Sequence, residues 1–582
     1  MMDQRNLIVA IALTFAILMG YEYFIVKPQQ QRAADAGQTQ SAQKQASQNQ
    51  AAKDKVESTG LGAPQPAAPE LAPQDEMLSR VEALGKTQRI KIVSKRLAGS
   101  ISLKGGRVDD LSLNDYHVTL DKSSPTVTLL SPGGSKKAYY AEFGWSPLVR
   151  SGIAVPGPDT IWRPTDTVLS PGRPVSLVWD NGAGLRFIRT YILDENYMFT
   201  VTQRVENLGA APVTLAPYGR LYRGSTPKVR GIYILHEGAL GVFDGQLEEV
   251  KYKEMRKKQR IEKTSTGGWI GITDKYWLTA LIPDQSRRFT GHFNHAVLGG
   301  ADKYQVDFLL DAQTLPPGAT IEVTSRLFAG AKVVALIDTY AKQYQIALFD
   351  KAIDWGFFFF LTKPIFYALD FFYRLIGNFG LAILLLTVII KAIFFPLANK
   401  SYRAMSKMKQ LQPKMAEIRE QYADDKVRQQ QETMALYKRE KVNPMAGCLP
   451  MLIQIPVFFA LYKVLFITIE MRHAPFYGWV HDLSAPDPLK LFNLFGLIPW
   501  DPPGLLGIGV WPVLMGISMF LQQRLNPQPA DQTQARIFMF MPLIFTFILA
   551  SFPVGLVIYW TWNNLLSMAQ QWVIMKRMGV NP

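Results

Sequence analysis

Five apolar runs in the last third of the chain limit what it can fold into. They cover residues 377–398, 447–468, 505–522, 536–551 and 554–573, and several are short or interrupted by Pro450, Pro456, Pro512 or Pro542. A helix needs ~20 apolar residues to cross the hydrocarbon core of a bilayer. Because lipid offers no partner to backbone polar groups, such runs must be helical. The sequence therefore predicts a helical membrane core with five spans.

Composition indicates that other parts of the chain are not embedded. Hydrophobic residues make up 48% and charged residues 19%, with a mean hydropathy of +0.02, which indicates a mosaic of membrane and soluble parts. The net charge of +16 is no sign of a nucleic-acid-binding protein by itself, because basic loops beside membrane spans produce the same excess. The single cysteine, Cys448, excludes an intrachain disulfide. We predict no sequence-specific nucleic-acid partner.

Another apolar run, Leu7–Val26, lies near the amino terminus. A cleaved signal peptide is the alternative to a membrane anchor, and Ala34-Asp35-Ala36 is a passable cleavage site. The apolar region of a signal peptide has only ~7–15 residues, however, so we favour an uncleaved anchor over residues 1–27. Residues 28–84 are rich in Gln, Ala, Ser and Pro without apolar periodicity, which predicts a disordered tether.

Residues 85–345 have the pattern of a β domain. Short or alternating apolar runs such as RIKIVS and GLRFIRTYIL are separated by Gly, Pro, Asn and Asp, and the stretch AKVVALIDTYAKQY at the end reads as a helix. Length and spacing favour a large all-β sandwich. Residues 346–376 are aromatic but carry six charges, which favours a helix lying in the membrane interface over a span.

Loop charges orient these segments. The segment 399–446 contains eleven basic and six acidic residues, whereas the loop 469–504 contains only Arg472 and Lys490 as basic residues. Basic loops remain on the inner side of a membrane. The segment 399–446, the short loop 523–535 and the tail 574–582 are therefore expected inside, with both termini, and the β domain outside.

The inner segment 399–446 also has helical periodicity. Its apolar residues are spaced by 3, 3, 4, 3 and 4 positions, which places them on one helical face: Met405, Met408, Leu411, Met415, Ile418 and Tyr422. A turn at Ala423-Asp424-Asp425 precedes a second helix with Val427, Met434 and Tyr437 on one face. We predict a helical hairpin with basic outer faces.

One lysine interrupts the first apolar run, which reads LLLTVIIKAIFFPLANK over 384–400. Lys391 lies ~18 Å along this helix from Phe379, within a core of ~30 Å. Its side chain can snorkel to the inner surface. The five runs contain no Asp or Glu to pair with it, but Gln454, Gln522, Gln523, Asn563, Asn564, Gln570 and Gln571 lie in or beside the other runs. Because charge inside a membrane faces a cavity or the bundle interior, we favour a wet groove open to the inside.

Long stretches of the sequence resemble the YidC family of bacterial membrane protein insertases. They include LTVIIKAIFFPL, SYRAMSKMKQLQPKM, MALYKREKVNPMAGCLPMLIQIPVFFALYKVL, MRHAPFYGWVHDLSAPDP and FPVGLVIYWTWNNLLSMAQQW. The resemblance covers 345–575, while the anchor, tether and β domain match the Gram-negative form by their order. It implies a five-span core with an amino-terminal anchor helix, an interface helix, a cytoplasmic hairpin and a periplasmic β-supersandwich similar to sugar mutarotases, in the bacterial inner membrane.

The resemblance also implies a function without bond chemistry. The family inserts inner-membrane proteins and helps them fold, alone or with the Sec translocon and its accessory subunits. The expected partners are nascent inner-membrane proteins, the ribosome and membrane lipids. We therefore expect no enzymatic activity, no catalytic residue, no metal and no cofactor.

Family motifs assign residues to this function. The family has an arginine where this chain has Lys391, and the other groove residues would be Thr387, Gln454 and Tyr559. The apolar faces of 451–465 and 539–549 would guide an incoming helix. Because the tail is short, ribosome contacts are weakened or move to the hairpin, whose basic residues include Arg403, Lys407, Lys409, Lys414 and Arg419.

Two other functions are weaker. A transporter or channel would need paired intramembrane charges or inverted repeats, whereas we identify one charge, Lys391, and no repeat. A sugar-processing enzyme would need a site in the β domain, where His292 and His295 form the only close histidine pair. In a strand these two side chains point to opposite faces, so we expect both histidines to be solvated loop residues and not a catalytic or metal-binding pair.

Overall fold

The computed structural model describes residues 78–147, 152–227, 235–442, 449–498, 500, 502, 506–526 and 532–579. The predicted anchor 1–27, most of the predicted tether and Cys448 lie outside these residues. The chain divides into two compact units, of which the smaller includes Tyr402–Gly447 and the larger includes Gln65–Ser401 and Cys448–Pro582.

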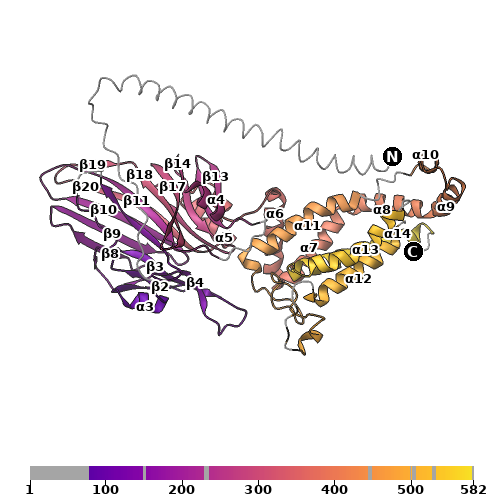
Figure 1. Ribbon diagram of the computed structural model, residues 1–582, viewed down its shortest axis with the longest axis horizontal. Helices are drawn as coiled ribbons and strands as arrows, with labels where there is room; N and C mark the ends of the chain where they lie inside the picture. Colours follow the sequence, from indigo (N-terminus) through magenta and orange to yellow (C-terminus); the bar gives the residue numbers. More distant parts are fainter. Residues whose placement is uncertain are drawn as a thin grey trace, which may run out of the picture. The chain divides into compact units, whose positions relative to one another are not determined.

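The β domain of the larger unit has two sheets, which Figure 1 shows as stacked layers. The described strands of the larger sheet are β1 Arg89–Val93, β2 Leu97–Ser102, β3 Arg107–His117, β4 Thr126–Leu130, β5 Tyr139–Pro147, β7 Val168–Leu169, β11 Val213–Arg223, β14 Arg260–Thr266, β17 Arg288–Leu298, β18 Ala301–Leu310 and β19 Gln313–Leu315. Those of the second sheet are β6 Arg163–Pro164, β8 Val175–Asp180, β9 Leu185–Leu193, β10 Met198–Asn207, β12 Gly238–Phe243, β13 Gln246–Lys251, β15 Trp269–Thr273, β16 Trp277–Ile282 and β20 Thr320–Ala331.

Alternating burial explains these sheets. Along β10, fully buried residues such as Val201 and Val205 alternate with half-buried polar ones. β10 pairs antiparallel with β9 on one side and β20 on the other. Large aromatic side chains, including Phe187, Phe199 and Trp269, are completely buried in the core. The prediction of an all-β domain is confirmed.

Three short helices accompany the sheets: α3 Arg80–Gly85, α4 Tyr252–Lys258 and α5 Val334–Gln343. The first corrects the predicted tether, which extended to residue 84. Ser79 accepts a hydrogen bond from the backbone N–H of Glu82, and the Glu82 side chain accepts one from the N–H of Ser79. This capping box stabilises a helix where composition alone predicted disorder.

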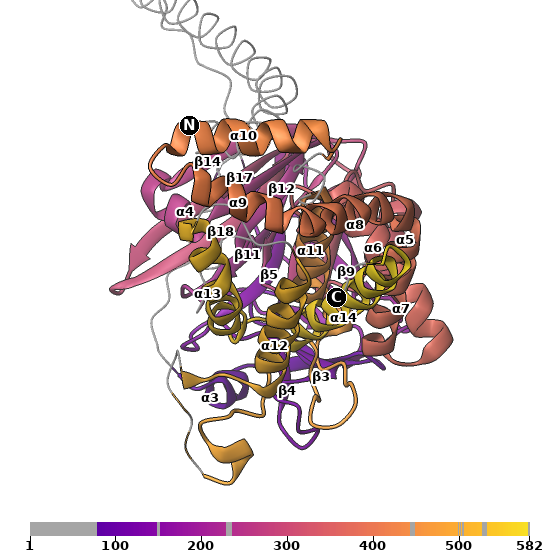
Figure 2. The ribbon, with the colours of Figure 1, turned by 90° about the vertical axis from the view of Figure 1, so that its right-hand side faces the viewer.

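The carboxyl-terminal region is helical, as predicted. Its elements are η3 Phe349–Ala352, α6 Phe359–Ile376, α7 Phe379–Ile393, α8 Phe395–Gln410, α9 Gln412–Gln421, α10 Lys426–Arg439, α11 Leu449–Ile467, η5 Ile469–Met471, η6 Leu494–Gly496, α12 Val510–Leu525, α13 Gln532–Leu549 and α14 Val554–Arg577. Helix α14 packs against α7, α11 and α12 (Figure 2). Within the described ranges no single helix is long and apolar enough to cross a membrane, although the bent pair of α7 and α8 is, by length and composition.

The observed helices differ from the predicted ones at three prolines. The predicted helix 377–398 ends at Ile393, and α8 follows after a bend of 70°. Pro396 explains the break, because it lacks an N–H and its ring clashes with the carbonyl of Ala392. Conversely, Pro456 and Pro542 were expected to interrupt their runs, yet α11 and α13 continue through them.

The segment predicted as an interface helix is α-helical only from Phe359 onward, after the short 3-10 helix η3. Four of its six charges form pairs within the segment: Lys363 lies 3.0 Å from Asp350, and Arg374 lies 2.8 Å from Asp370. The aromatic side chain of Phe360 is 64% exposed. Paired charges beside exposed aromatic rings suit a helix at a membrane surface.

In the smaller unit, the first arm of the predicted hairpin is divided. Helix α8 ends at Gln410 and α9 starts at Gln412, because Pro413 in the first turn of α9 cannot continue a helix. The turn before α10 is stabilised by Asp425, whose side chain accepts hydrogen bonds from the N–H groups of Val427 and Arg428. The arms meet where the Tyr437 hydroxyl lies 3.3 Å from the Met415 sulfur.

Candidate functional site

Lys391 points at another helix of the bundle. It lies in the last turn of α7, and its Nζ donates a hydrogen bond of 2.7 Å to the Ser567 hydroxyl on α14. Ser567 is only 2% exposed and donates in turn to the backbone carbonyl of Asn563 at 2.8 Å. Ser567 is not among the groove residues predicted from the sequence.

Ser567 belongs to a polar stripe on α14 that consists of Tyr559, Asn563, Ser567 and Gln571. Residues four apart lie on one face of a helix, so the stripe is ~18 Å long. All four side chains are at least nine-tenths buried. This four-residue spacing is visible in the sequence and could have identified Ser567 as part of the polar face of α14.

The neighbouring helices contact this stripe along its length. Gln454 of α11 donates a hydrogen bond to the Tyr559 hydroxyl. Gln571 donates to the backbone carbonyl of Leu525 at 3.0 Å and to the Asn526 side chain at 3.2 Å, at the end of α12. The structure therefore brings together three of the predicted groove residues, Lys391, Gln454 and Tyr559, around the α14 stripe.

Thr387 does not join them through a hydrogen bond. It is 2% exposed, and its hydroxyl donates to the backbone carbonyl of Ile383, one turn earlier in α7, at 2.7 Å. A hydroxyl satisfied by its own helix is a common arrangement in apolar surroundings.

Some polar atoms of α14 retain hydrogen-bonding capacity. The side-chain oxygens of Asn563 and Gln571 and the side-chain nitrogen of Gln570 are buried and have no hydrogen-bond partner among the described residues. Buried polar groups in native proteins are nearly always hydrogen-bonded. These three atoms are therefore unsatisfied hydrogen-bonding groups in the interior of the bundle.

A second lysine in the apolar runs corrects the expectation of a single charge. Lys463 lies towards the end of α11, and its Nζ is 2.9 Å from the Asp354 carboxylate, in the segment before α6. No ion pair of Lys391 occurs in the described part of the chain, and the runs themselves contain no Asp or Glu. Lys463 is thus neutralised by a carboxylate, whereas the hydrogen-bond partner of Lys391 is a neutral hydroxyl.

The apolar faces expected to guide an incoming helix are exposed. Ile455 and Phe459, one turn apart on α11, are 45% and 46% exposed, and Leu543 and Ile544 of α13 are 55% and 50% exposed. The described residues thus offer unpartnered apolar side chains on both helices.

In the hairpin unit, exposure differs among the predicted contact residues. Arg403, Lys407 and Lys414 are exposed, whereas Lys409 and Arg419 are half-buried. Lys414 forms an ion pair of 3.1 Å with Glu440 of the second arm. Of the three exposed basic residues, Arg403 and Lys407 form no ion pair with the described residues.

The histidine pair of the β domain is not in a solvated loop, which corrects that expectation. Both residues lie in strand β17 and are buried: His292 is 2.7 Å from the Asp307 carboxylate, and His295 is 2.8 Å from that of Asp302. The two side chains lie on opposite faces of β17, yet His292 is 3% and His295 9% exposed, so both faces of the strand are covered at these positions. No cluster suited to a metal ion was found among the described residues.

Comparison with known proteins gives consistent matches over nearly the whole chain. Residues 89–368 match the family model of the YidC periplasmic domain, and residues 371–581 match that of the 60Kd inner membrane protein. The chain is 51% identical over 601 residues to the membrane protein insertase YidC of Methylobacterium sp. (strain 4-46), covering 99% of this chain and 96% of that protein. It is 50% identical to the YidC of Rickettsia felis, covering 98% and 99%.

Two solved structures are also similar. A crystal structure of an active YidC insertase covers 83% of this chain and 92% of its own, with 18% identity and a TM-score of 0.35. The match to the structure of a putative aldose 1-epimerase from Escherichia coli K12 covers 41% of this chain and 98% of that protein, with 11% identity and a TM-score of 0.29.

Proposed function

This chain belongs to the YidC family of inner-membrane protein insertases, and from that premise we propose that nascent membrane proteins enter the bilayer along the α14 stripe, opposite Lys391. The observation that carries the proposal is the hydrogen bond of 2.7 Å between Lys391 and Ser567. It directs the cation towards a row of polar side chains inside the bundle.

This contact favours the groove over snorkelling. A snorkelling lysine extends its stem towards the end of its own helix and keeps the ammonium in bulk water. Lys391 instead donates to a residue that is 2% exposed on a different helix. An ammonium has three donors, so Lys391 can bind water or a carboxylate in addition to Ser567.

Insertion then follows from two physical effects. The polar flank of a substrate must cross hydrocarbon, and a hydrated polar stripe that extends partway across shortens that path. The positive charge of Lys391 attracts acidic residues in the flank, and the low dielectric constant strengthens this attraction. The apolar segment leaves water along the exposed faces of α11 and α13, which is favourable by ~25 cal/mol per Å² of apolar area.

The mechanism requires a point charge and not an arginine. Lysine lacks the planar fork with which arginine binds a carboxylate through two parallel hydrogen bonds. The neutral partner Ser567 and the buried amides of α14 suit a hydrated ammonium. We infer that charge and hydration, and not bidentate binding, operate in this chain.

We further propose five spans after an amino-terminal anchor, both termini in the cytoplasm and the β domain in the periplasm. The eleven basic residues of 399–446 support this orientation. An impermeant thiol reagent added from outside should label a cysteine placed at position 298, since Leu298 is 37% exposed, and should miss one at Arg403. Labelling in the reverse pattern would invert the topology.

The exposed basic side chains of the hairpin are the proposed docking point for the ribosome, through electrostatic attraction to its polyanionic surface. Cooperation with the Sec translocon and its accessory subunits is proposed from family membership. The described residues offer no catalytic constellation, and the family name denotes an insertase and not an enzyme.

Substrate pairs test the role of Lys391. Cells depleted of the native protein would express a variant together with a small membrane protein that has either an acidic or a neutral translocated flank. Protease protection measures insertion. We expect Lys391→Arg to retain insertion, Lys391→Ala to impair the acidic flank more than the neutral one, and Lys391→Glu to impair the acidic flank most. Lys400→Ala is the matched control, because Lys400 is an exposed cation nine residues further along the chain.

Two results would contradict this role. If Arg, Ala and Glu at position 391 all insert both substrates as the parent does, Lys391 snorkels and has no part in insertion. If only Glu fails and flank charge makes no difference, the defect lies in folding of the insertase itself.

A further inference from the structure

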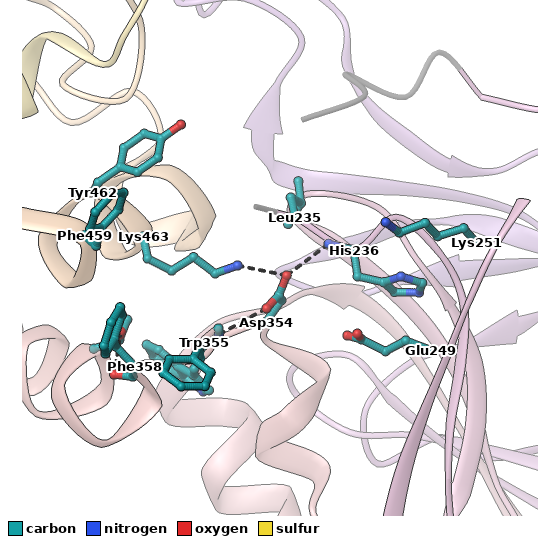
Figure 3. A pocket seen from close by; sticks show the side chains of 13 residues that line it. Leu235, His236, Glu249, Lys251, Asp354, Trp355, Phe358, Phe459, Tyr462 and Lys463 are labelled. Atoms are coloured by element: carbon teal, nitrogen blue, oxygen red, sulfur yellow. Dashed lines mark hydrogen bonds and ion pairs between the residues drawn. The ribbon is translucent and has the colours of Figure 1, made fainter. Parts of the chain in front are cut away.

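A cavity of about 330 Å³ lies where the β domain meets the helical region (Figure 3). Its walls come from β13, which is an edge strand of its sheet, from the segment before α6 and from α11. Its volume is within the range of ~300–1,000 Å³ that is typical of small-molecule sites. Neither Lys391 nor the α14 stripe lines it, so it is distinct from the insertion site.

One side of the cavity carries charges of both signs. The Asp354 carboxylate accepts hydrogen bonds from the Lys463 ammonium at 2.9 Å and from the backbone N–H of His236 at 3.0 Å. Glu249 and Lys251 lie two residues apart on β13, and Figure 3 shows both side chains turned towards Asp354. The formal charges of these four side chains, two carboxylates and two ammonium groups, sum to zero.

Glu249 is the carboxylate with capacity for a cation. Among the described residues it has no ion pair or hydrogen bond. Burial and the neighbouring Asp354 raise the pKa of Glu249, and a bound cation would oppose both effects. Burial lowers the pKa of His236 to about 4, so that ring is neutral at pH 7 and does not compete for the carboxylate.

The other side of the cavity is aromatic and open. Phe357, just before α6, is 48% exposed, and Phe459 of α11 is 46% exposed. Aromatic rings beside polar groups are typical of the level of lipid headgroups in a membrane.

We propose that this cavity binds the headgroup of a zwitterionic phospholipid with a primary ammonium, such as phosphatidylethanolamine. The ammonium would lie against Glu249 and the phosphate against the ammonium groups of Lys251 and Lys463, each of which has three donors. The acyl chains would lie along Phe357 and Phe459. A lining with both signs and no net charge fits a zwitterion better than an anionic headgroup.

A polypeptide is the weaker occupant. A lysine side chain of a substrate would satisfy Glu249 but would bring no acceptor for further N–H donors of the Lys251 and Lys463 ammonium groups. A phospholipid supplies both charges and the apolar chains that match the two aromatic rings. Location of the site in the outer leaflet rests on the orientation proposed above, but binding itself does not.

Titration of the purified full-length protein in detergent tests the proposal. The probes are short-chain phosphatidylethanolamine, phosphatidylglycerol with the same chains, and chain-free phosphoethanolamine, with binding measured by native mass spectrometry. Glu249→Gln should weaken phosphatidylethanolamine binding about tenfold, because a hydrogen bond to a charged group is lost, and should leave phosphatidylglycerol binding unchanged. Glu248→Gln is the matched control, since Glu248 lies on the other face of β13 and pairs with Lys263 at 2.6 Å.

Three results would overturn the proposal. Equal phosphatidylethanolamine affinity in the parent and Glu249→Gln would show that Glu249 does not bind the ammonium. Phosphoethanolamine that binds as tightly as the lipid would assign the cavity to a soluble ligand. A lysine-containing apolar peptide that binds more tightly than either lipid, and only with Glu249 present, would assign it to a polypeptide.

A second variant covers the case in which Glu249→Gln does not fold. Phe357→Ala removes a ring that is 48% exposed, so it leaves the core intact. It should weaken both lipids and leave phosphoethanolamine unaffected. Lipid binding that is unchanged in Phe357→Ala would also overturn the proposed site. Because neither assay measures insertion, failure here leaves the role of Lys391 intact.

Discussion

Glu142 should be among the most sensitive positions of the β domain. Its carboxylate is completely buried and lies 2.6 Å from Arg107 and 2.9 Å from Arg220. Burial by itself would raise the pKa of Glu142, but Arg220 and Arg107 outweigh it and lower the pKa from 4.5 to about 2. Such a shift corresponds to about 3 kcal/mol of stabilisation by the ionised form. Glu142→Gln leaves two buried guanidinium groups uncompensated, and breaking buried pairs costs about 3–5 kcal/mol.

The pH dependence has a definite sign. A carboxylate whose pKa is depressed in the folded state stabilises the fold fully above its unfolded pKa and loses this contribution as the pH falls. The stability gap between the parent and Glu142→Gln should therefore be complete above pH ~5 and should shrink by about 2 kcal/mol between pH 5 and pH 3.

Thermal unfolding of the full-length protein in detergent, followed by the survival of the β domain in brief proteolysis, measures this effect. A loss of about 3 kcal/mol lowers the midpoint of a domain of this size by about 6–12 °C. Glu322→Gln is the control, because Glu322 is exposed on β20. If Glu142→Gln lowers the midpoint no more than this control, or if the gap does not depend on pH, the argument from the buried ion pairs is refuted.

Two further predictions concern packing between the carboxyl-terminal helices. Gln523→Leu should destabilise the helical region by about 1–3 kcal/mol. Pro542 has no N–H to donate to the Phe538 carbonyl, and the Gln523 side chain donates to it instead. Gln522→Leu is the control, because Gln522 does not make that hydrogen bond, and it should be near neutral in the same melting assay. Gly516→Ala should cost about 1–3 kcal/mol, since its added Cβ would lie 2.1 Å from the Thr546 hydroxyl. The double variant with Thr546→Ala should recover most of that loss, and additive losses would contradict the assigned contact.

Local pattern was enough for the fold class. Alternation in stretches such as β10 predicts strands without knowledge of their partners, because the burial period of two is a property of the extended chain. The stripe from Met405 to Tyr422 likewise predicts a helical arm. The errors occurred where one residue overrides a pattern: Pro396 and Pro413 end helices that periodicity would continue, and Ser79 starts one where composition predicts disorder.

The chemistry of single residues indicated which residues matter but not what they touch. Lys391 is conspicuous because it is a charge among apolar residues, and Gln454 and Tyr559 followed from a family resemblance. Their contacts depend on how α7 and α11 are rotated against α14. Ser567 was missed although it continues the four-residue spacing of Tyr559, Asn563 and Gln571, because that spacing marks a polar helix face and not the residue that lies opposite Lys391.

Hydropathy, loop charge and periodicity are properties of neighbouring residues, so the order of segments and the inner-side bias of 399–446 can be derived from the chain alone. The pairing of Lys463 with Asp354, the burial of His292 and His295, and the alignment of Lys391 with Ser567 join residues far apart in sequence. Side-chain packing between elements determines the rotation and register of each helix and strand, and no local pattern contains that information. For this reason the tertiary structure alone decided which polar groups share the interior of the bundle.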